Sequence, residues 1–145
     1  MVNMDFNDTG YTIKKVQFLI HNLMNKKLLT ISLTLPQYSV LKVLKDNGPI
    51  TGAKLAKESF VTPQTMHTLL VGMENRNLIE RNAIEGNNKS LNISITDHGI
   101  SVLKNADDVL DDVIKNGNQV LNSDEHTQLM GLLVRLYDGL STVNN

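Results

Sequence analysis

Apolar residues recur every three or four positions near both ends of the chain, which is the spacing of one face of a helix. The first stripe predicts an amphipathic helix over 11–27. Two later stripes predict a long helix over 97–116, ended or bent by Gly117, and a final helix that begins after Asn122. In chain order the stripes are formed by Ile13, Val16, Ile20 and Leu23, by Leu103, Ala106, Leu110 and Val113, and by Leu129, Leu132, Leu133, Leu136 and Leu140.

Three threonines between these helices stand where a helix N-cap is expected: Thr34, Thr51 and Thr62. They predict helices over 34–45, 51–58 and 62–75, with a proline at the first position of the last one. The second and third of these helices, one short and one longer, are separated by a brief turn. That outline is typical of a helix-turn-helix.

The apolar period changes from about 3.6 to 2 after Asn77. Leu91, Ile93 and Ile95 alternate with polar residues and predict a half-buried strand. Residues 78–84 form the partner strand, and residues 85–89 between the two strands have turn chemistry, because Gly and Asn tolerate positive φ. A β-hairpin therefore follows the longer helix directly.

The composition is that of one globular domain, with 145 residues of which 41% are hydrophobic and 20% charged. No apolar run approaches the roughly 18 residues of a membrane span, and the first residues do not have the pattern of a signal peptide. The sequence therefore predicts a cytoplasmic protein without membrane contact. The absence of cysteine excludes thiolate nucleophiles and thiolate-bound metals.

The net charge of −1 conceals an uneven distribution of charge along the chain. The charge is +3 over residues 1–50, zero over 51–99 and −4 over 100–145. A protein that binds nucleic acid normally has a basic surface, so the total charge argues mildly against DNA binding. The distribution remains compatible with a protein that is basic on one face only.

The order of these elements, and the residues at their joints, resembles the MarR family of winged-helix transcription regulators. The matching segments are, in order, residues 33–38, 55–58, 61–65, 73–74, 78–81 and 95–99, and the resemblance spans about residues 11–140. It implies a mainly α fold with a small β-hairpin wing, in which long terminal helices flank a winged helix-turn-helix domain. Residues 1–145 then form a single domain with the winged part at 34–99, its wing at 78–96, and dimerisation helices at 11–30 and 100–143.

The sequence departs from the family pattern at three places. Asn87, Asn88 and Lys89 stand where family wings usually carry Asp-x-Arg, so one cation remains there. Thr68 stands where the recognition helix commonly has Arg. Asn77 replaces a Gly after that helix, and Asn can adopt the left-handed conformation that this position requires.

The resemblance makes the helix over 62–75 the recognition helix, whose exposed N-terminal face would enter the major groove of DNA. Four side chains on that face would reach base edges: Gln64, Thr65, His67 and Thr68. Gln pairs with adenine and Thr contacts thymine, so A·T pairs are expected in the half-sites. The alternative interpretation is an ordinary solvated helix face.

Other residues would hold the DNA backbone without reading its sequence. The caps Thr51 and Thr62 leave backbone N–H groups suited to phosphate oxygens. The side chains expected at the phosphates or the minor groove are Lys54, Arg81, Asn88 and Lys89. Any one of these cations is more often simply solvated, and Arg81 is the exception that the family motif favours.

The terminal helices carry wider apolar stripes than one small domain can cover. In the family such helices interlock as a homodimer; the alternative is that they fold back on their own winged domain. The family also often binds small aromatic or anionic effectors between these helices and the winged part. Phe18, His21 and Tyr38 come from the elements that would line such a site, and they are equally suited to a core.

Enzymatic chemistry has no support in the sequence. His21, His67, His98 and His126 are scattered without ligand spacing, and no phosphate-binding glycine loop is present, so neither a metal nor a cofactor is predicted. The sequence thus predicts a homodimeric repressor on a palindromic operator, relieved by a small effector. The alternative is a winged-helix module that binds protein and no longer binds DNA.

Overall fold

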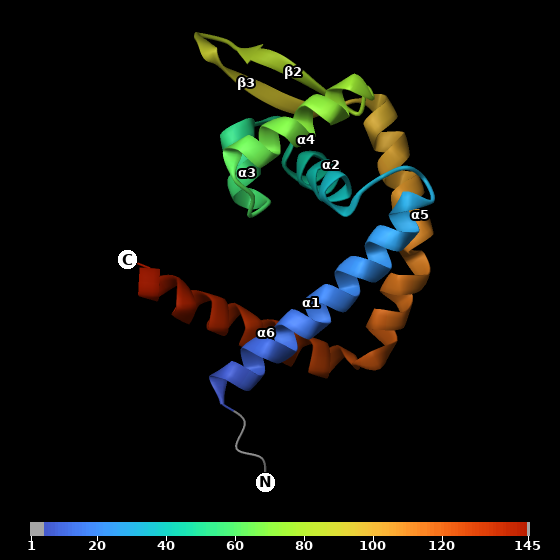
Figure 1. Ribbon diagram of the computed structural model, residues 1–145, viewed down its shortest axis with the longest axis vertical. Helices are drawn as coiled ribbons and strands as arrows, with labels where there is room; N and C mark the ends of the chain where they lie inside the picture. Colours follow the sequence, from blue (N-terminus) through green and yellow to red (C-terminus); the bar gives the residue numbers. More distant parts are fainter. Residues whose placement is uncertain (1–4, 145) are drawn as a thin grey trace. The chain divides into compact units, whose positions relative to one another are not determined.

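The computed structural model describes residues 5–144, apart from the side chains of Asn88 and Asn144. In chain order its elements (Figure 1) are α1 (Phe6–Leu29), α2 (Leu35–Asn47), β1 (Ile50–Thr51), α3 (Gly52–Glu58), α4 (Pro63–Asn75), β2 (Ile79–Ile84), β3 (Asn87–Ile95), α5 (Asp97–Val120), α6 (Ser123–Ser141) and the 3-10 turn η1 (Thr142–Asn144). The chain forms two compact units, of which the first ends at Leu110 and the second begins at Asp111. The mainly helical fold is as predicted.

The predicted N-caps are confirmed, because their side-chain oxygens accept backbone N–H groups of the first turn. Thr34 and Asn122 each form a reciprocal capping box, and Thr51 and Thr62 accept from the residues three positions later. Asp5 forms a further capping box with Asp8 that the sequence interpretation missed, and α1 therefore begins at Phe6. These caps fix where α1, α2, α3, α4 and α6 begin.

Three helices, α1, α3 and α4, are followed by a non-glycine residue in the left-handed conformation, which is Ser32, Phe60 and Asn77 respectively. At the end of α4, Asn77 has φ 56°, and the Leu78 amide donates to the Met73 carbonyl. The left-handed conformation expected for Asn77 is thus confirmed. At the end of α3, Phe60 has φ 54°, and this residue is 83% exposed. A bulky residue is unusual there, because its Cβ crowds the following carbonyl oxygen.

The sheet has three antiparallel strands in the order β1-β3-β2, one more than the predicted hairpin. The extra strand is Ile50–Thr51, whose Ile50 faces Ile93 of β3. Two residues carry no periodic signal, which is why the sequence pattern did not reveal this strand. The turn is also shorter than the predicted 85–89, because β3 already begins at Asn87 and a bulge at Ala83 and Ile84 absorbs the difference.

The start of α5 is fixed against the turn that precedes the wing. The hydroxyl of Thr96 donates to the Asn77 carbonyl at 2.6 Å, and the Thr96 amide donates to the Leu78 carbonyl at 3.1 Å. Gly99 packs so closely there that a Cβ would collide with the same Leu78 carbonyl. Gly117 does not end the helix, which continues to Val120.

The first unit has a continuous apolar core built from α2, α3, α4, the sheet, the end of α1 and the start of α5. Its fully buried side chains include Leu28, Leu33, Leu41, Leu44, Leu55, Met66, Met73, Leu78, Leu103 and Leu110. Most of the predicted stripe on α1 lies outside this core, with Ile13, Val16, Ile20 and Leu23 between 39% and 52% exposed. This part of α1 therefore has an apolar face that the winged domain does not cover.

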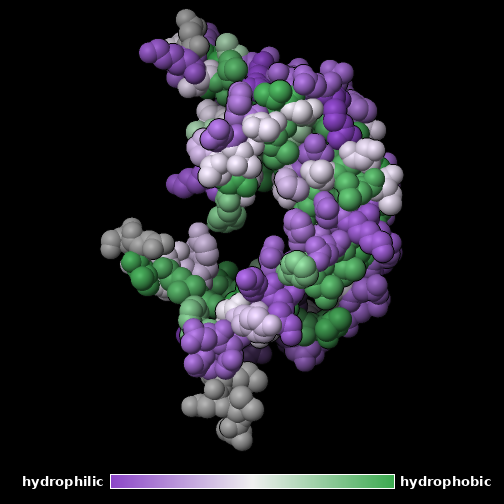
Figure 2. Space-filling model, viewed as in Figure 1, coloured by the Kyte–Doolittle hydropathy of each residue, from purple (hydrophilic) through white to green (hydrophobic). Residues whose placement is uncertain are grey.

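The second unit consists of the end of α5 together with α6 and η1. None of the α6 side chains is buried, although Leu129, Leu132, Leu133, Val134 and Leu140 are all apolar. Figure 2 accordingly shows hydrophobic surface along the helix that leads to the C-terminus. Among the described residues, no helix has the length and apolar character that crossing a bilayer requires.

Candidate nucleic-acid interface

The helix α4 has one buried face and one polar face. Met66, Leu70 and Met73 point into the core at intervals of four and three residues, as a helix stripe must. The opposite face therefore carries Gln64, Thr65, His67 and Thr68, all of which are exposed. Four of the predicted site residues thus share the first two turns of one solvent-facing helix surface.

Hydrogen bonds on this face leave two of the four side chains free. The Thr62 hydroxyl donates to the Thr65 hydroxyl at 2.9 Å, and the Thr68 hydroxyl donates to the Gln64 carbonyl at 3.2 Å. Within the described part of the chain, the side chains of Gln64 and His67 make no hydrogen bond. These two side chains can therefore offer donors and acceptors to a base edge without first breaking an internal bond.

The two cationic residues of the wing, Lys89 and Arg81, differ in their exposure to solvent. Lys89, near the start of β3, is exposed, and its amide donates to the Asn87 side chain at 3.1 Å. Asn87 thus shapes the turn, and the side chain of Asn88 lies outside the described residues. Arg81, on β2, is only 16% exposed and its Nε lies 3.2 Å from the Glu74 Oε2 on α4.

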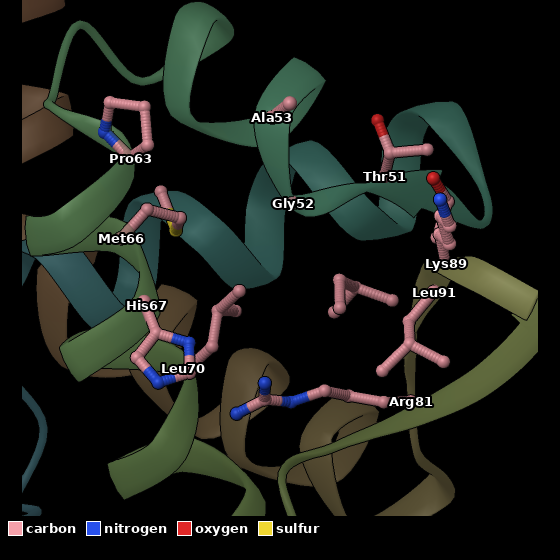
Figure 3. Close-up of a pocket in the computed structure, with 12 residues that line it drawn as sticks. Thr51, Gly52, Ala53, Pro63, Met66, His67, Leu70, Arg81, Lys89 and Leu91 are labelled. Atoms are coloured by element: carbon pink, nitrogen blue, oxygen red, sulfur yellow. The ribbon is translucent and has the colours of Figure 1, made fainter.

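A cavity of about 340 Å³ lies between the start of α3, α4 and the wing. Its apolar floor includes Met66, Leu70 and Ile93. Its polar rim contains Thr51, His67, Arg81 and Lys89, and the Arg81 guanidinium extends toward the His67 ring (Figure 3). Four predicted site residues from β1, α4, β2 and β3 are thus gathered around one hollow.

The remaining predicted residues lie beside this cavity rather than in its lining. Thr62, Gln64, Thr65 and Thr68 belong to the first turns of α4, and Lys54 is an exposed residue of α3 whose amide donates to the Thr51 hydroxyl. The sequence interpretation missed Ser90 and Leu91, which line the cavity from β3. The alternation of polar and apolar residues along β3 is visible in the sequence. The sequence does not show which face of the strand meets α4.

The three residues predicted for an effector lie apart from this cavity. Phe18, on α1, is 65% exposed, His21 is half-buried, and Tyr38 belongs to the core of the first unit. Burial raises the pKa of Tyr38 well above its ordinary value, and the Asp107 carboxylate that accepts its hydrogen bond raises it further. Among the described residues, no group of His and carboxylate side chains could hold a metal ion.

Known proteins share both the sequence and the fold of this chain. The sequence profile of the MarR family matches residues 33–91. The transcriptional repressor Rv2887 of Mycobacterium tuberculosis is 30% identical over 101 residues, which cover 70% of this chain and 73% of the relative. The regulator PecS of Dickeya dadantii is 26% identical, over 92% of this chain and 81% of its own length.

Solved structures agree with the fold. The Staphylococcus aureus MepR–DNA complex matches with a TM-score of 0.82 and 21% identity, over 95% of this chain and 99% of that one. A mutant MarR of E. coli with operator DNA matches with a TM-score of 0.81 and 20% identity, over 92% and 99%. Both likenesses concern the arrangement of helices and wing.

The fold and the polar face of α4 define a winged helix-turn-helix regulator of transcription, a class of DNA-binding proteins. The chain belongs to the MarR family. Its 30% identical relatives in Mycobacterium are repressors by name. Because this is a family of regulators, the prediction that the chain is not an enzyme is confirmed.

Proposed function

We propose that the chain forms a homodimer that represses transcription in the cytoplasm by occupying a palindromic operator. The observation that carries this proposal is the gathering of Thr51, His67, Arg81 and Lys89 around one hollow beside the exposed polar face of α4. In a winged helix, α4 enters the major groove while the wing touches the adjacent backbone. MepR and MarR, which have the same fold, were both solved with DNA.

Separate residues carry base reading and backbone contact in this proposal. Gln64, Thr65, His67 and Thr68 meet base edges, and their chemistry favours A·T pairs. Phosphates are met by the N-cap backbone at Thr51 and Thr62 and by the side chains of Lys54, Arg81, Asn88 and Lys89. The cations of the winged part are few, so the affinity of one subunit is low and two half-sites must act together.

The terminal helices supply the second half-site in this proposal. We assign dimerisation to residues 11–30 and 100–143, the winged part to 34–99 with its wing at 78–96, and a single domain to 1–145. Support comes from the exposed apolar faces of α1 and of α6, each described within its own unit. Contiguous apolar surface of this kind marks an interface between proteins.

A small aromatic or anionic compound relieves repression in this proposal. Rv2887 was crystallised with salicylic acid and with p-aminosalicylic acid, which are both aromatic carboxylates. Phe18 and His21 on α1 are accessible to such a compound, and Tyr38 contributes only if its hydrogen bond to Asp107 opens. A change in melting temperature with salicylate, compared between the wild type and Phe18→Ala, tests this assignment.

Selection of duplexes from a random library by the purified full chain is the experiment that tests the main proposal. An enriched palindrome with A·T-rich half-sites about 34 Å apart, roughly one helical turn, is the expected result. Sedimentation at micromolar concentration should give twice 16.1 kDa. No enriched motif from a folded dimer would instead favour a winged-helix module that binds protein, and a 16.1 kDa monomer would remove the dimer.

A further inference from the structure

An ion pair joins the recognition helix to the wing. The Nε of Arg81 on β2 lies 3.2 Å from the Oε2 of Glu74, which stands in the last turn of α4. The two side chains are unequal, since Glu74 is 45% exposed and Arg81 only 16%. The pair thus fixes a long cationic side chain near the surface through a carboxylate that remains in contact with water.

The buried Arg81 side of this ion pair is stabilised by charge. The Arg81 Nε is shielded from solvent, and within the described part of the chain no acceptor lies in line with its N–H. Its stabilisation therefore comes from the nearby carboxylate charge, not from an aligned hydrogen bond. The terminal guanidinium nitrogens extend away from the strand to the cavity rim, toward the His67 ring (Figure 3).

We propose that Glu74 is a positioning residue for DNA binding, which holds the Arg81 guanidinium at the cavity rim, oriented toward a phosphate. This inference rests on the proposed function, in which Arg81 is a backbone contact. Arg has many rotamers, and a fixed guanidinium loses less freedom on binding than a mobile one. Glu74 itself touches no DNA in this arrangement.

The direction in which Glu74→Gln changes the affinity for DNA separates a positioning role from simple charge repulsion. A carboxylate near the interface repels phosphate, so removal of its charge alone strengthens binding to all DNA. A positioning role predicts the opposite, because loss of Glu74 releases Arg81 from the rim. Glu74→Gln should therefore weaken binding although the protein becomes less acidic.

Glu80→Gln is the matched control. Glu80 is exposed and precedes Arg81 on β2, and its replacement by Gln removes the same negative charge. Because side chains alternate along a strand, Glu80 lies on the other face of the sheet from Arg81. Binding to a duplex recovered from the random library should weaken about tenfold in Glu74→Gln, since Arg81 is released in both subunits. In Glu80→Gln it should stay equal or tighten. Glu74→Asp, which keeps the carboxylate, should lie closer to the wild type.

A double-mutant cycle distinguishes positioning from a structural role. In an Arg81→Ala background, Glu74→Gln should no longer weaken binding, because the residue that Glu74 orients is gone. The salt dependence of Glu74→Gln should approach that of Arg81→Ala, which a general loss of stability does not produce. Circular dichroism and the melting temperature verify that each variant is folded.

The outcomes separate this inference from the function on which it rests. If the wild type binds the duplex and Glu74→Gln binds as well or better, Glu74 does not position Arg81 and the regulator proposal stands. Equal weakening by Glu74→Gln with and without Arg81 also overturns the inference. A folded wild-type dimer that binds no selected duplex overturns both.

Discussion

The hydroxyl of Tyr38 on α2 donates a hydrogen bond of 2.9 Å to a carboxylate oxygen of Asp107 on α5, 69 positions further along the chain. The bond connects the first helix of the winged part to the helix that leaves it. Because both partners belong to the first unit, its effect is expected in the stability of that unit. Replacement of this single oxygen thus tests how firmly α5 is held.

We expect Tyr38→Phe to lower the free energy of unfolding by about 1 kcal/mol, the usual net contribution of such a bond. The pH dependence is a sharper measurement. The folded state raises the pKa of Tyr38 above its ordinary value of 10.0, so stability is complete below that pH and falls as pH rises above it. Denaturation between pH 9 and 11, roughly the range around that value, should show a steeper loss in the wild type than in Tyr38→Phe.

Gly99→Ala should destabilise the protein by about 1–3 kcal/mol, the typical cost of overpacking. The new Cβ would collide with the Leu78 carbonyl, and backbone at that point cannot give way as a flexible side chain does. Gly117→Ala in the same helix is the control, because nothing lies within 4 Å of it and Ala favours helix by about 1 kcal/mol. Equal denaturation midpoints for the two variants would contradict the close packing at Gly99.

Gln64→Ala tests base reading. Its side chain is exposed and forms no hydrogen bond with any other described residue. Removal of an adenine contact should therefore reduce the preference for the selected duplex over random DNA by roughly 1–3 kcal/mol. Competition titrations with the two DNAs measure that difference. Gln17→Ala on α1 removes an exposed Gln outside the winged part and should leave the preference unchanged. A preference unaltered by Gln64→Ala would remove this residue from the reading face.

Lys89→Ala tests backbone contact by the wing. We expect weaker binding to selected and random DNA alike, with a salt slope lower by roughly one unit for each phosphate that the protein no longer neutralises. Lys104→Ala, an exposed Lys on α5, provides the control for loss of one positive charge. Should the slope of Lys89→Ala match that of the wild type, the wing does not grip DNA and binding rests on α4.

Phe60→Gly should stabilise the protein by about 1 kcal/mol, because glycine adopts a left-handed conformation without steric cost. Little packing is lost, since the ring is 83% exposed. Phe60→Ala keeps a Cβ at φ 54° and should therefore resemble the wild type. Thermal unfolding of the three proteins checks the order, and an equally stable Phe60→Ala and Phe60→Gly would show that the backbone is not strained.

Local chemistry made much of this fold predictable. The caps at Thr34, Thr51, Thr62 and Asn122 depend on residues three positions apart, and their pattern is visible in the sequence. The two-residue strand β1 was not predictable, because its existence depends on β3 lying next to it. Propensity and period say nothing about which distant segment becomes the neighbour.

The sequence was enough to propose the residues of the candidate site, but it did not reveal their geometry. The family resemblance indicated Arg81 and His67, whereas the pairing of Arg81 with Glu74 depends on how α4 crosses β2. The sequence made Tyr38 a candidate for an effector site that was equally suited to a core, and the structure places it in the core. Side-chain direction, which only the packed structure supplies, determines the pairing of Arg81 with Glu74.

In the proposed homodimer, the apolar face of α6 makes the concentration of active repressor depend steeply on the number of chains. In a homodimer held together by such faces, the species that spans both half-sites forms from two chains. Below the dissociation constant of the dimer, its concentration rises with the square of the chain concentration. A twofold fall in chain number then lowers the bound species fourfold, so a modest change in synthesis would release the operator within a narrow range.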